Sequence, residues 1–319
     1  MSYLLDVKNL QTFFYTRSGI VKAINIIDFH IDKGETLALV GESGCGKSMT
    51  ALSILRLVPE PGRIVNGTIS FNGRDLRNMP ADEIRRVRGN QISMIFQEPM
   101  TSLNPVLRIG DQLSETLNLH KGLSKKDSLV FAAELLSQVG IPSASQRLRD
   151  YPHQLSGGMR QRVMIAMALA CDPELLIADE PTTALDVTIQ AQIMALLDEL
   201  KRSRGMATLL ITHDLGIVAE SADRVAIMYS GQILEMASVT ELYAKPFHPY
   251  TKGLLGCIPH IGKKRKRLTP IEGNVPAPGT SQDGCSFLER CPENFAPCGN
   301  KIPPLREIDP GHLVRCWRI

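Results

Sequence analysis

The sequence lacks any run long enough to form a membrane-spanning helix. Its longest apolar stretches, such as residues 163–171, have the length of a core helix, whereas a bilayer requires about 20 apolar residues. The first ten residues also lack the basic region and apolar segment of a signal peptide. We therefore expect a cytoplasmic protein that acts at a membrane only through partners.

Strong charge of one sign is also missing. The 319 residues carry a formal net charge of +3, with 43% hydrophobic and 22% charged residues, which is ordinary for a soluble globular protein. So weak a net charge does not by itself argue for nucleic acid as a partner. The length allows one large domain with an appendage, or two domains.

The chain is organised around a glycine-rich stretch, GESGCGKS, at residues 41–48. It follows the apolar run at residues 36–40 and leads into a helical pattern at residues 49–57. This order of strand, turn and helix is what a phosphate-binding P-loop requires. The alternative is an ordinary glycine-rich turn, since short patterns recur by accident. No Asn-Lys-x-Asp sequence is present, which argues against a P-loop GTPase.

The residue types of this stretch suit a polyphosphate. Gly41, Gly44 and Gly46 let the backbone curl so that N–H groups face the anion, and the following helix start adds positive potential. Lys47 can reach the β- and γ-phosphates, and the Ser48 hydroxyl can bind Mg²⁺. The other candidate nucleotide contacts of the loop are Ser43, Cys45 and Met49.

Two carboxylates follow an apolar run at residues 175–178. A carboxylate at the carboxyl end of a strand beside a P-loop is placed to serve Mg²⁺, so Asp179 takes this role. Glu180 points elsewhere and could polarise the attacking water. On its own the pattern fits a strand that ends in solvated acids equally well. The P-loop upstream favours the catalytic interpretation.

A second helix start at residues 155–159, LSGGM, also suits an anion. Ser156 is predicted to be the N-cap, and Gly157 and Gly158 leave backbone N–H groups accessible. A capped helix without a ligand is the alternative.

The patterns elsewhere predict an α/β fold. Residues 3–75 alternate apolar and polar as in a strand-rich lobe, and residues 110–170 have helical periodicity. Three apolar strand-like runs follow, separated by helical segments such as residues 189–202. Apolar strands that alternate with helices indicate a mostly parallel sheet covered on both faces.

Together these residues resemble the ATP-binding subunits of ABC transporters, over about residues 3–240. The six motifs are GESGCGKS as Walker A, Gln97 as the Q-loop glutamine, LSGGM as the signature, LLIADE (175–180) as Walker B, Ala184, Leu185 and Asp186 as the D-loop, and His213 as the switch histidine. Met159 stands where the family more often has Gln.

The resemblance implies a P-loop ATPase domain of ABC type at residues 1–245. An antiparallel β subdomain and a helical subdomain at about 98–170 belong to it, and residues 246–319 form a small cysteine-rich extension. Two such domains meet head to tail, so that the signature of one chain, with Ser156, Gly157 and Gly158, contacts ATP held by the other. Asp186 of the D-loop is a further expected nucleotide-site residue.

The resemblance also implies roles for single residues. His213 contacts the γ-phosphate. Gln97 belongs to both the catalytic group and the Mg²⁺ ligands, and it begins the segment that meets a membrane partner. Phe14 is the preferred adenine-stacking residue, with Tyr15 as the second choice. Either aromatic could instead be part of a strand core.

The tail carries a further resemblance. His248 to Thr251, HPYT, is similar to the C-terminal signature of the oligopeptide/dipeptide (and nickel) importer group. It implies import of peptides, a second ATPase subunit that in this group is commonly a different chain, two polytopic permeases, and indirect contact with an extracytoplasmic solute-binding protein. A homodimer is the alternative, because all the motifs of this chain are intact. The expected place is the cytoplasmic face of the cell membrane, with no nucleic acid. A nickel importer, or a soluble ABC ATPase acting on nucleic acid or ribosomes, is the alternative.

The basic run at residues 263–267 fits a solvated linker, or a site for nucleic acid or acidic headgroups.

Four of the seven cysteines lie in the last 35 residues: Cys285, Cys291, Cys298 and Cys316. Disulfides are disfavoured in a reducing cytoplasm, so a metal site is expected. The gaps do not match the C-x-x-C pairs of zinc ribbons, and an iron–sulfur cluster tolerates wider spacing. The importer group implies such a cluster, of the 4Fe–4S kind. Zinc and free thiols remain alternatives. The cysteines predicted to be packing residues are Cys45, Cys171 and Cys257.

Overall fold

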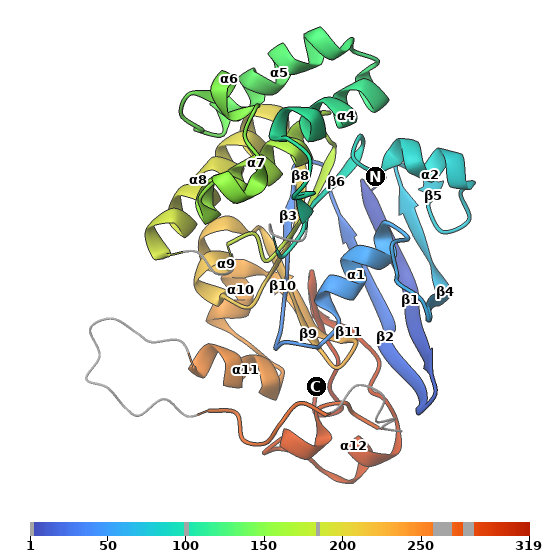
Figure 1. Cartoon of the computed structure of the whole chain (residues 1–319). Coiled ribbons are helices and arrows are strands. Elements are labelled where there is room, and N and C mark those ends of the chain that lie inside the picture. The colour runs from blue at the N-terminus through green and yellow to red at the C-terminus, as the bar shows by residue number, and fades with distance from the viewer. Residues whose placement is uncertain (1–2, 99–101, 183–185, 258–269, 277–283) are drawn as a thin grey trace. The chain divides into compact units, whose positions relative to one another are not determined.

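The structure is a computed structural model that describes residues 3–98, 102–182, 186–257, 270–276 and 284–319 (Figure 1). The chain divides into two compact units. The first comprises Met1–Asp32, Thr36–Arg77 and Ile211–Ile319, and the second comprises Lys33–Glu35 and Asn78–Leu210. Among the described residues no helix is both long and apolar enough to span a membrane.

One sheet of the first unit is antiparallel throughout, with strand order β2-β1-β4-β5. Its strands are β1 (Leu5–Thr16), β2 (Gly19–Ile31), β4 (Gly62–Phe71) and β5 (Arg74–Asp75). Leu5 pairs with Ile31 on one side and Phe71 on the other. Asn72 and Gly73 both have positive φ, as a two-residue hairpin turn requires. The predicted antiparallel β subdomain is confirmed.

A second set of strands in this unit runs in the order β11-β12-β10-β9-β3. The strands are β3 (Thr36–Val40), β9 (Arg224–Tyr229), β10 (Gln232–Ser238), β11 (Arg306–Asp309) and β12 (His312–Val314). Only β3 and β9 pair in parallel, and the other neighbours are antiparallel. The strands from β11 to β9 therefore form an antiparallel part of the sheet, whereas a mostly parallel sheet was expected. The reason is a tight β9–β10 hairpin in which Ser230 and Gly231 have φ of 43° and 77°.

A buried carboxylate on β10 ties the tail of the chain to this sheet. Glu235 has no exposed surface, and it accepts hydrogen bonds from the backbone amides of Phe247 (2.8 Å) and His248 (2.9 Å). Its Oε1 also lies 2.8 Å from Nε2 of His312 on β12. The helices of this unit are α1 (Lys47–Ile54), α9 (Leu215–Ser221), α10 (Val239–Ala244), α11 (Pro249–Gly256), the 3₁₀ turn η2 (Leu288–Arg290) and α12 (Ala296–Asn300).

The described part of the second unit holds three strands and a group of helices. In it β6 (Ile92–Ile95) and β7 (Leu175–Asp179) pair in parallel, and β8 (Ala207–Thr212), whose last two residues are counted with the first unit, is the next strand after β7. The helices are α2 (Ala81–Val87), α4 (Ile109–Lys121), α5 (Lys125–Gln138), α6 (Ala144–Arg147), the 3₁₀ turn η1 (Pro152–Gln154), α7 (Gly157–Leu169) and α8 (Val187–Arg204). The predicted helical region is confirmed.

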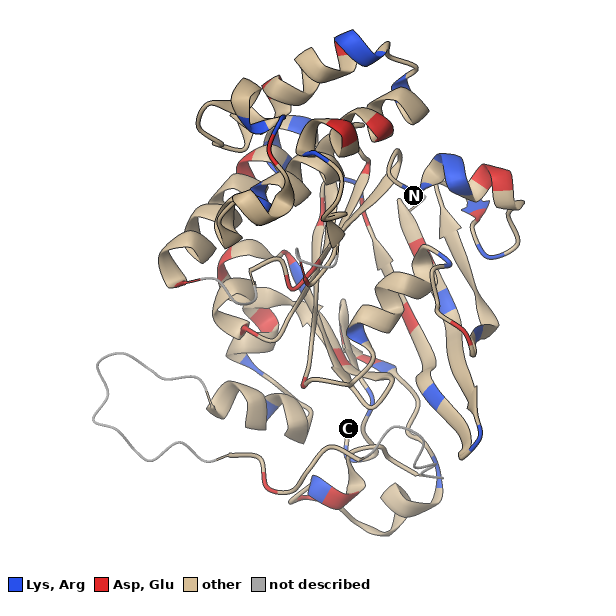
Figure 2. Cartoon of the chain, in the orientation of Figure 1, with Lys and Arg blue, Asp and Glu red and all other residues tan. Residues whose placement is uncertain are grey.

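Charges of both signs are interspersed along the elements (Figure 2). Helix α2 shows the arrangement that suits a helix dipole, with Asp82 and Glu83 in its first turn and Arg85 and Arg86 in its last.

The predicted domain boundary near residue 245 stays a prediction. The strands β11 and β12, which follow it in the sequence, continue the sheet begun by β10. The predicted basic run at 263–267 lies outside the described residues.

Candidate functional site

The P-loop connects β3 to α1 in the first unit, and its glycines are sterically required. Gly44 and Gly46 have φ of 78° and 107°, values that residues other than glycine rarely adopt. A Cβ on Gly41 would lie 2.1 Å from the Met228 carbonyl oxygen, and one on Gly46 would lie 2.6 Å from the Ala23 oxygen. The loop is thus pressed against neighbouring backbone, so its amides have a fixed direction.

Lys47 is folded back onto the loop. Its side chain belongs to a residue only 5% exposed, and Nζ donates to the carbonyl oxygens of Gly41 (2.7 Å) and Glu42 (3.1 Å). A buried ammonium needs such partners. A phosphate can replace these carbonyls with a stronger, charged acceptor. Ser43 is exposed, Ser48 and Met49 are partly buried at the start of α1, and Cys45 is buried.

Cys45 belongs to the packing of the loop, as predicted. Its carbonyl accepts a hydrogen bond from Gly231 (2.9 Å), in the β9–β10 turn, and burial raises the pKa of its thiol. The second predicted packing cysteine, Cys171, is also buried, whereas Cys257 is only partly so.

His213 follows directly after β8 and is exposed. The next residue, Asp214, caps α9 by accepting from the Gly216 amide (2.8 Å). The predicted adenine-stacking residues lie on β1. Phe14 is partly buried and its ring lies against Gly62, where a Cβ would come within 2.7 Å of the ring, while Tyr15 is 48% exposed.

In the second unit the two Walker B carboxylates have different surroundings. Asp179 ends the wholly buried strand β7 and is 3% exposed. Glu180 is partly buried and has a left-handed φ of 46°, a strained conformation that is often found at functional sites. The structure brings Gln97 to this residue, because Gln97 Nε2 donates to Glu180 Oε2 at 3.1 Å.

The signature residues begin α7. The Ser156 side chain accepts from the Met159 amide (3.3 Å), which confirms the predicted N-cap. Ser156 and Gly157 are exposed, and Gly158 is partly buried, its Cα facing Ile189. In the D-loop, Ala184 and Leu185 lie outside the described residues. Asp186 caps α8 by accepting from the Ile189 amide (2.9 Å).

Sequence reasoning missed Gln161. This residue of α7 is 2% exposed, and its Nε2 donates to the carbonyl oxygen of Pro181 at 2.5 Å. The contact connects the signature helix to the residue after Glu180. A polar residue on the buried face of a predicted helix was the available signal, since buried amides normally have partners.

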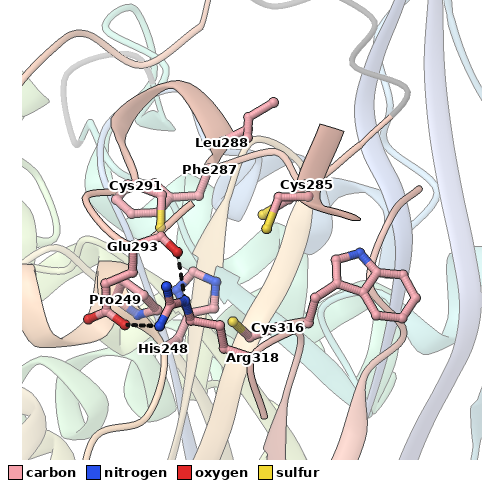
Figure 3. Close-up of a pocket in the computed structure, with 11 residues that line it drawn as sticks. His248, Pro249, Cys285, Phe287, Leu288, Cys291, Glu293, Cys316 and Arg318 are labelled. Carbon is pink, nitrogen blue, oxygen red and sulfur yellow. Dashed lines mark hydrogen bonds and ion pairs between the residues drawn. The ribbon is translucent and has the colours of Figure 1, made fainter. Parts of the chain in front are cut away.

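The four tail cysteines line one cavity (Figure 3). Burial raises the pKa of the Cys285 thiol to about 11, and the neighbouring Cys298, Cys316 and Cys291 add to the rise. Burial also raises the pKa values of Cys291 and Cys316. Within the part of the chain that the structure describes, no group of three or more His, Cys, Asp or Glu side chains surrounds a point where one metal ion could sit.

The HPYT segment starts α11, with Pro249 at its first helical position. The Nδ1 atom of His248 accepts from the Tyr250 amide (3.0 Å) and caps the helix. Burial lowers the pKa of His248 to about 3, and the charge of Lys252 contributes to this shift. The imidazole is therefore neutral at physiological pH and can act as an acceptor.

A glycine-rich anion loop, a strand that ends in paired carboxylates and a capped LSGGM helix define a P-loop ATPase with an ABC signature. Comparisons with known proteins agree. The ABC transporter family matches residues 24–183, and the oligopeptide/dipeptide transporter C-terminal region matches residues 234–298. The chain belongs to the ABC transporter ATP-binding family and is an ATPase of that type.

Full-length relatives refine this assignment. The chain is 52% identical to the oligopeptide transport ATP-binding protein AppD of Bacillus subtilis, over 99% of this chain and 97% of AppD. It is 49% identical to the oligopeptide transport ATP-binding protein OppD of Salmonella typhimurium, over 99% and 93%. A dimeric ATP-binding cassette bound to ADP and Pi superposes with a TM-score of 0.67 at 27% identity, over 74% of this chain and 98% of that one.

Proposed function

We propose that this chain hydrolyses ATP to power the import of di- or oligopeptides through membrane permease subunits, at the cytoplasmic face of the cell membrane. The observation that carries the proposal is the presence on one chain of an ABC ATPase core and the C-terminal region of oligopeptide/dipeptide transporters. Relatives named for oligopeptide transport match it over 99% of its length.

In this proposal the first unit binds the phosphates of ATP. The amides of the P-loop and the start of α1 surround the β- and γ-phosphates, and Lys47 exchanges the carbonyls of Gly41 and Glu42 for phosphate oxygens. Ser48, Gln97 and Asp179 are the residues that would hold Mg²⁺, which neutralises charge on the phosphate oxygens when bound. Phe14 stacks on the adenine, with Tyr15 as the alternative.

Glu180 is the proposed general base for hydrolysis. A water oxygen attacks the γ-phosphorus while the bond to the bridging oxygen breaks, and the water's proton passes to the Glu180 carboxylate. The products are ADP and inorganic phosphate. The hydrogen bond from Gln97 orients this carboxylate before ATP arrives, and His213 contacts the γ-phosphate.

We propose that a second and different ATPase subunit completes the site. Ser156, Gly157, Gly158 and Asp186 of this chain contact the ATP held by that subunit. Two polytopic permeases couple closure of the dimer to transport, and an extracytoplasmic solute-binding protein delivers the cargo.

The tail cysteines are proposed to hold an iron–sulfur cluster, of the 4Fe–4S kind. Four thiols on one cavity suit the ligand set of such a cluster. Because burial raises the pKa of Cys285, binding must expel its proton. Anaerobically purified protein should contain iron and labile sulfide and absorb visible light. Zinc alone would refute this assignment.

The transport proposal is tested by co-purification and reconstitution. The chain should co-purify with polytopic membrane subunits, and peptides presented with the binding protein should stimulate ATP turnover in vesicles. Stimulation by nickel in place of peptide would make the chain a metal importer subunit. A wholly soluble protein whose turnover is stimulated by RNA or DNA would contradict transport altogether.

A further inference from the structure

A partly buried ion pair joins the C-terminal tail to the P-loop. Arg290 Nη1 lies 2.6 Å from Glu42 Oε2, and Nη2 lies 3.2 Å from Glu42 Oε1. The two residues are 248 positions apart, and the Arg290 side chain is 4% exposed while that of Glu42 is 32% exposed. An exposed ion pair contributes little to structure. A bidentate pair with a buried guanidinium fixes geometry more strongly.

Arg290 has little freedom to leave this position. Its Nε donates to the Glu272 carbonyl (3.0 Å) and Nη2 also donates to that of Ile271 (3.3 Å). The guanidinium carbon lies 5.8 Å from the centre of the Tyr229 ring. The arginine is therefore held in place by the tail and by β9 before it contacts Glu42.

The HPYT segment also contacts Glu42, through the backbone amide of Glu42. The Glu42 amide donates to the hydroxyl of Tyr250 (3.2 Å), a residue with no exposed surface. The Tyr250 ring lies against those of Tyr229 and Phe287, with centroids 4.8 and 5.3 Å away. Glu42 in turn accepts at its carbonyl oxygen from Lys47. The tail thus contacts the residue that holds the phosphate-binding lysine.

The same tail segment lines the cysteine cavity. The turn η2 carries Arg290 and ends at Cys291, whose amide bonds the Leu288 carbonyl. Phe287 lines the cavity together with Cys285 and Cys291 (Figure 3) and also lies against Tyr250. The cysteine cavity and the residues that contact Glu42 therefore share one short segment of the tail.

We propose that Arg290 and Tyr250 are positioning residues of the P-loop. Through these two residues, the conformation of the tail segment that carries Cys285, Cys291 and Cys298 sets the affinity for ATP. This inference rests on the proposed ATPase function of the site. It does not depend on peptide transport. By thermodynamic reciprocity, ATP must also stabilise the tail to the same degree.

The test measures the Kd of a fluorescent ATP analogue with the full-length chain. Arg290→Met should raise the Kd about tenfold, equal to about 1.4 kcal/mol, and Arg290→Lys, which keeps charge but loses the fork, should fall between. Arg306→Met is the matched control, because Arg306 is an exposed tail arginine stacked on Trp317. It should leave the Kd unchanged.

Two further measurements separate positioning from mere anchoring of the tail. In a Glu42→Gln background, Arg290→Met should add no further loss of affinity, because the interaction is already broken. Cys291→Ser should raise the Kd in the parent and raise it less in that background, where only the contact of Tyr250 with the backbone amide of residue 42 remains. Amide exchange of residues 41–48 should be faster in Arg290→Lys, a variant mild enough to remain folded.

Unchanged ATP affinity in Arg290→Met, with a lowered unfolding temperature, would overturn the proposal and leave only a structural pair. Equal effects of Cys291→Ser in the two backgrounds would overturn the link to the cysteines. Neither peptide nor permease enters these measurements. If the chain failed to support transport but gave the expected Kd values and amide exchange, only the transport proposal would be refuted.

Discussion

At the scale of single residues, the two Walker B carboxylates show how adjacent positions acquire different chemistry. Asp179 remains in the buried strand, whereas the left-handed backbone at Glu180 turns the next side chain away and Gln97 holds it. A strained residue persists only where its surroundings fix it. Here the fixed carboxylate is the one that we propose as the base for the attacking water.

Glu180→Gln should therefore separate binding from hydrolysis. The amide keeps the size of the side chain but cannot accept the water's proton, so ATP binds as in the parent while turnover falls by at least about a hundredfold. The closed dimer should accumulate with ATP, visible by size-exclusion chromatography. Turnover at the parent rate would show that another group is the base.

Gly46→Ala should weaken nucleotide binding strongly for a steric reason. The new Cβ would lie 2.6 Å from the Ala23 oxygen at a φ of 107°, so the loop must move. We expect the Kd for ATP to rise more than about tenfold. Gly34→Ala is the control, because Gly34 also has positive φ but open space around it. It should cost about 1 kcal/mol of stability and leave ATP binding intact.

The sequence predicted the motif residues of the site but few of their contacts. The spacing in GESGCGKS and LLIADE identifies the residue types that the chemistry needs. It says nothing of the Gln97–Glu180 hydrogen bond or of Gln161 and Pro181, because such contacts depend on how distant segments fold together. Arg290 is the clearest case. As one of several arginines in a cysteine-rich tail, it carried no signal for the P-loop.

At the scale of elements, the start of α7 combines two functions in one residue. Ser156 caps the helix, and it is also the residue proposed to meet a phosphate. These functions can be separated because aspartate caps a helix as well as serine does, but it brings a negative charge.

Ser156→Asp and Ser156→Ala form a matched pair. The aspartate variant should keep the parent unfolding temperature and lose ATP turnover by at least about tenfold, since its carboxylate repels the phosphate. The alanine variant should lose about 1 kcal/mol of stability. Calorimetry and phosphate release give both quantities. Parent turnover in Ser156→Asp would remove Ser156 from the site.

The tail hairpin was the element that could not be predicted. Strands β11 and β12 read as part of a Pro- and Cys-rich extension, and β12 pairs with β10 some 80 positions earlier in the sequence. The buried Glu235 gave no sign of this pairing, because its partners come from separate segments. The β9–β10 turn was recognisable in principle from Ser230 and Gly231.

Glu235→Ala should destabilise the first unit strongly. It leaves His312 and the amides of Phe247 and His248 without their buried acceptor, at a cost of about 3–5 kcal/mol. Glu235→Gln retains one oxygen and should cost less. Urea unfolding followed by circular dichroism measures both variants. Equal stability of Glu235→Ala and the parent would mean that water replaces the carboxylate.

At the scale of the whole molecule, one chain carries both a phosphate loop and a signature helix. If each composite site uses the loop of one chain and the signature of another, a pair of chains needs one intact loop and one intact signature, on opposite members. Two variants that are each inactive can then supply one working site between them. The intact motifs of this chain make two copies sufficient for the test, even though the proposed natural partner is a different subunit.

Mixing Lys47→Ala with Ser156→Asp should therefore restore part of the ATP turnover that each lacks alone. In the mixed pair, the loop of the Ser156→Asp chain faces the signature of the Lys47→Ala chain, and both are intact. The opposite site combines the Lys47→Ala loop with the Ser156→Asp signature and is inactive. Phosphate release at high protein concentration measures the effect. Replacing Ser156→Asp by the double variant must abolish the recovery, because no intact loop then remains. Failure to recover at every mixing ratio would show that two copies of this chain do not complete each other's sites, and that the different partner subunit is obligatory.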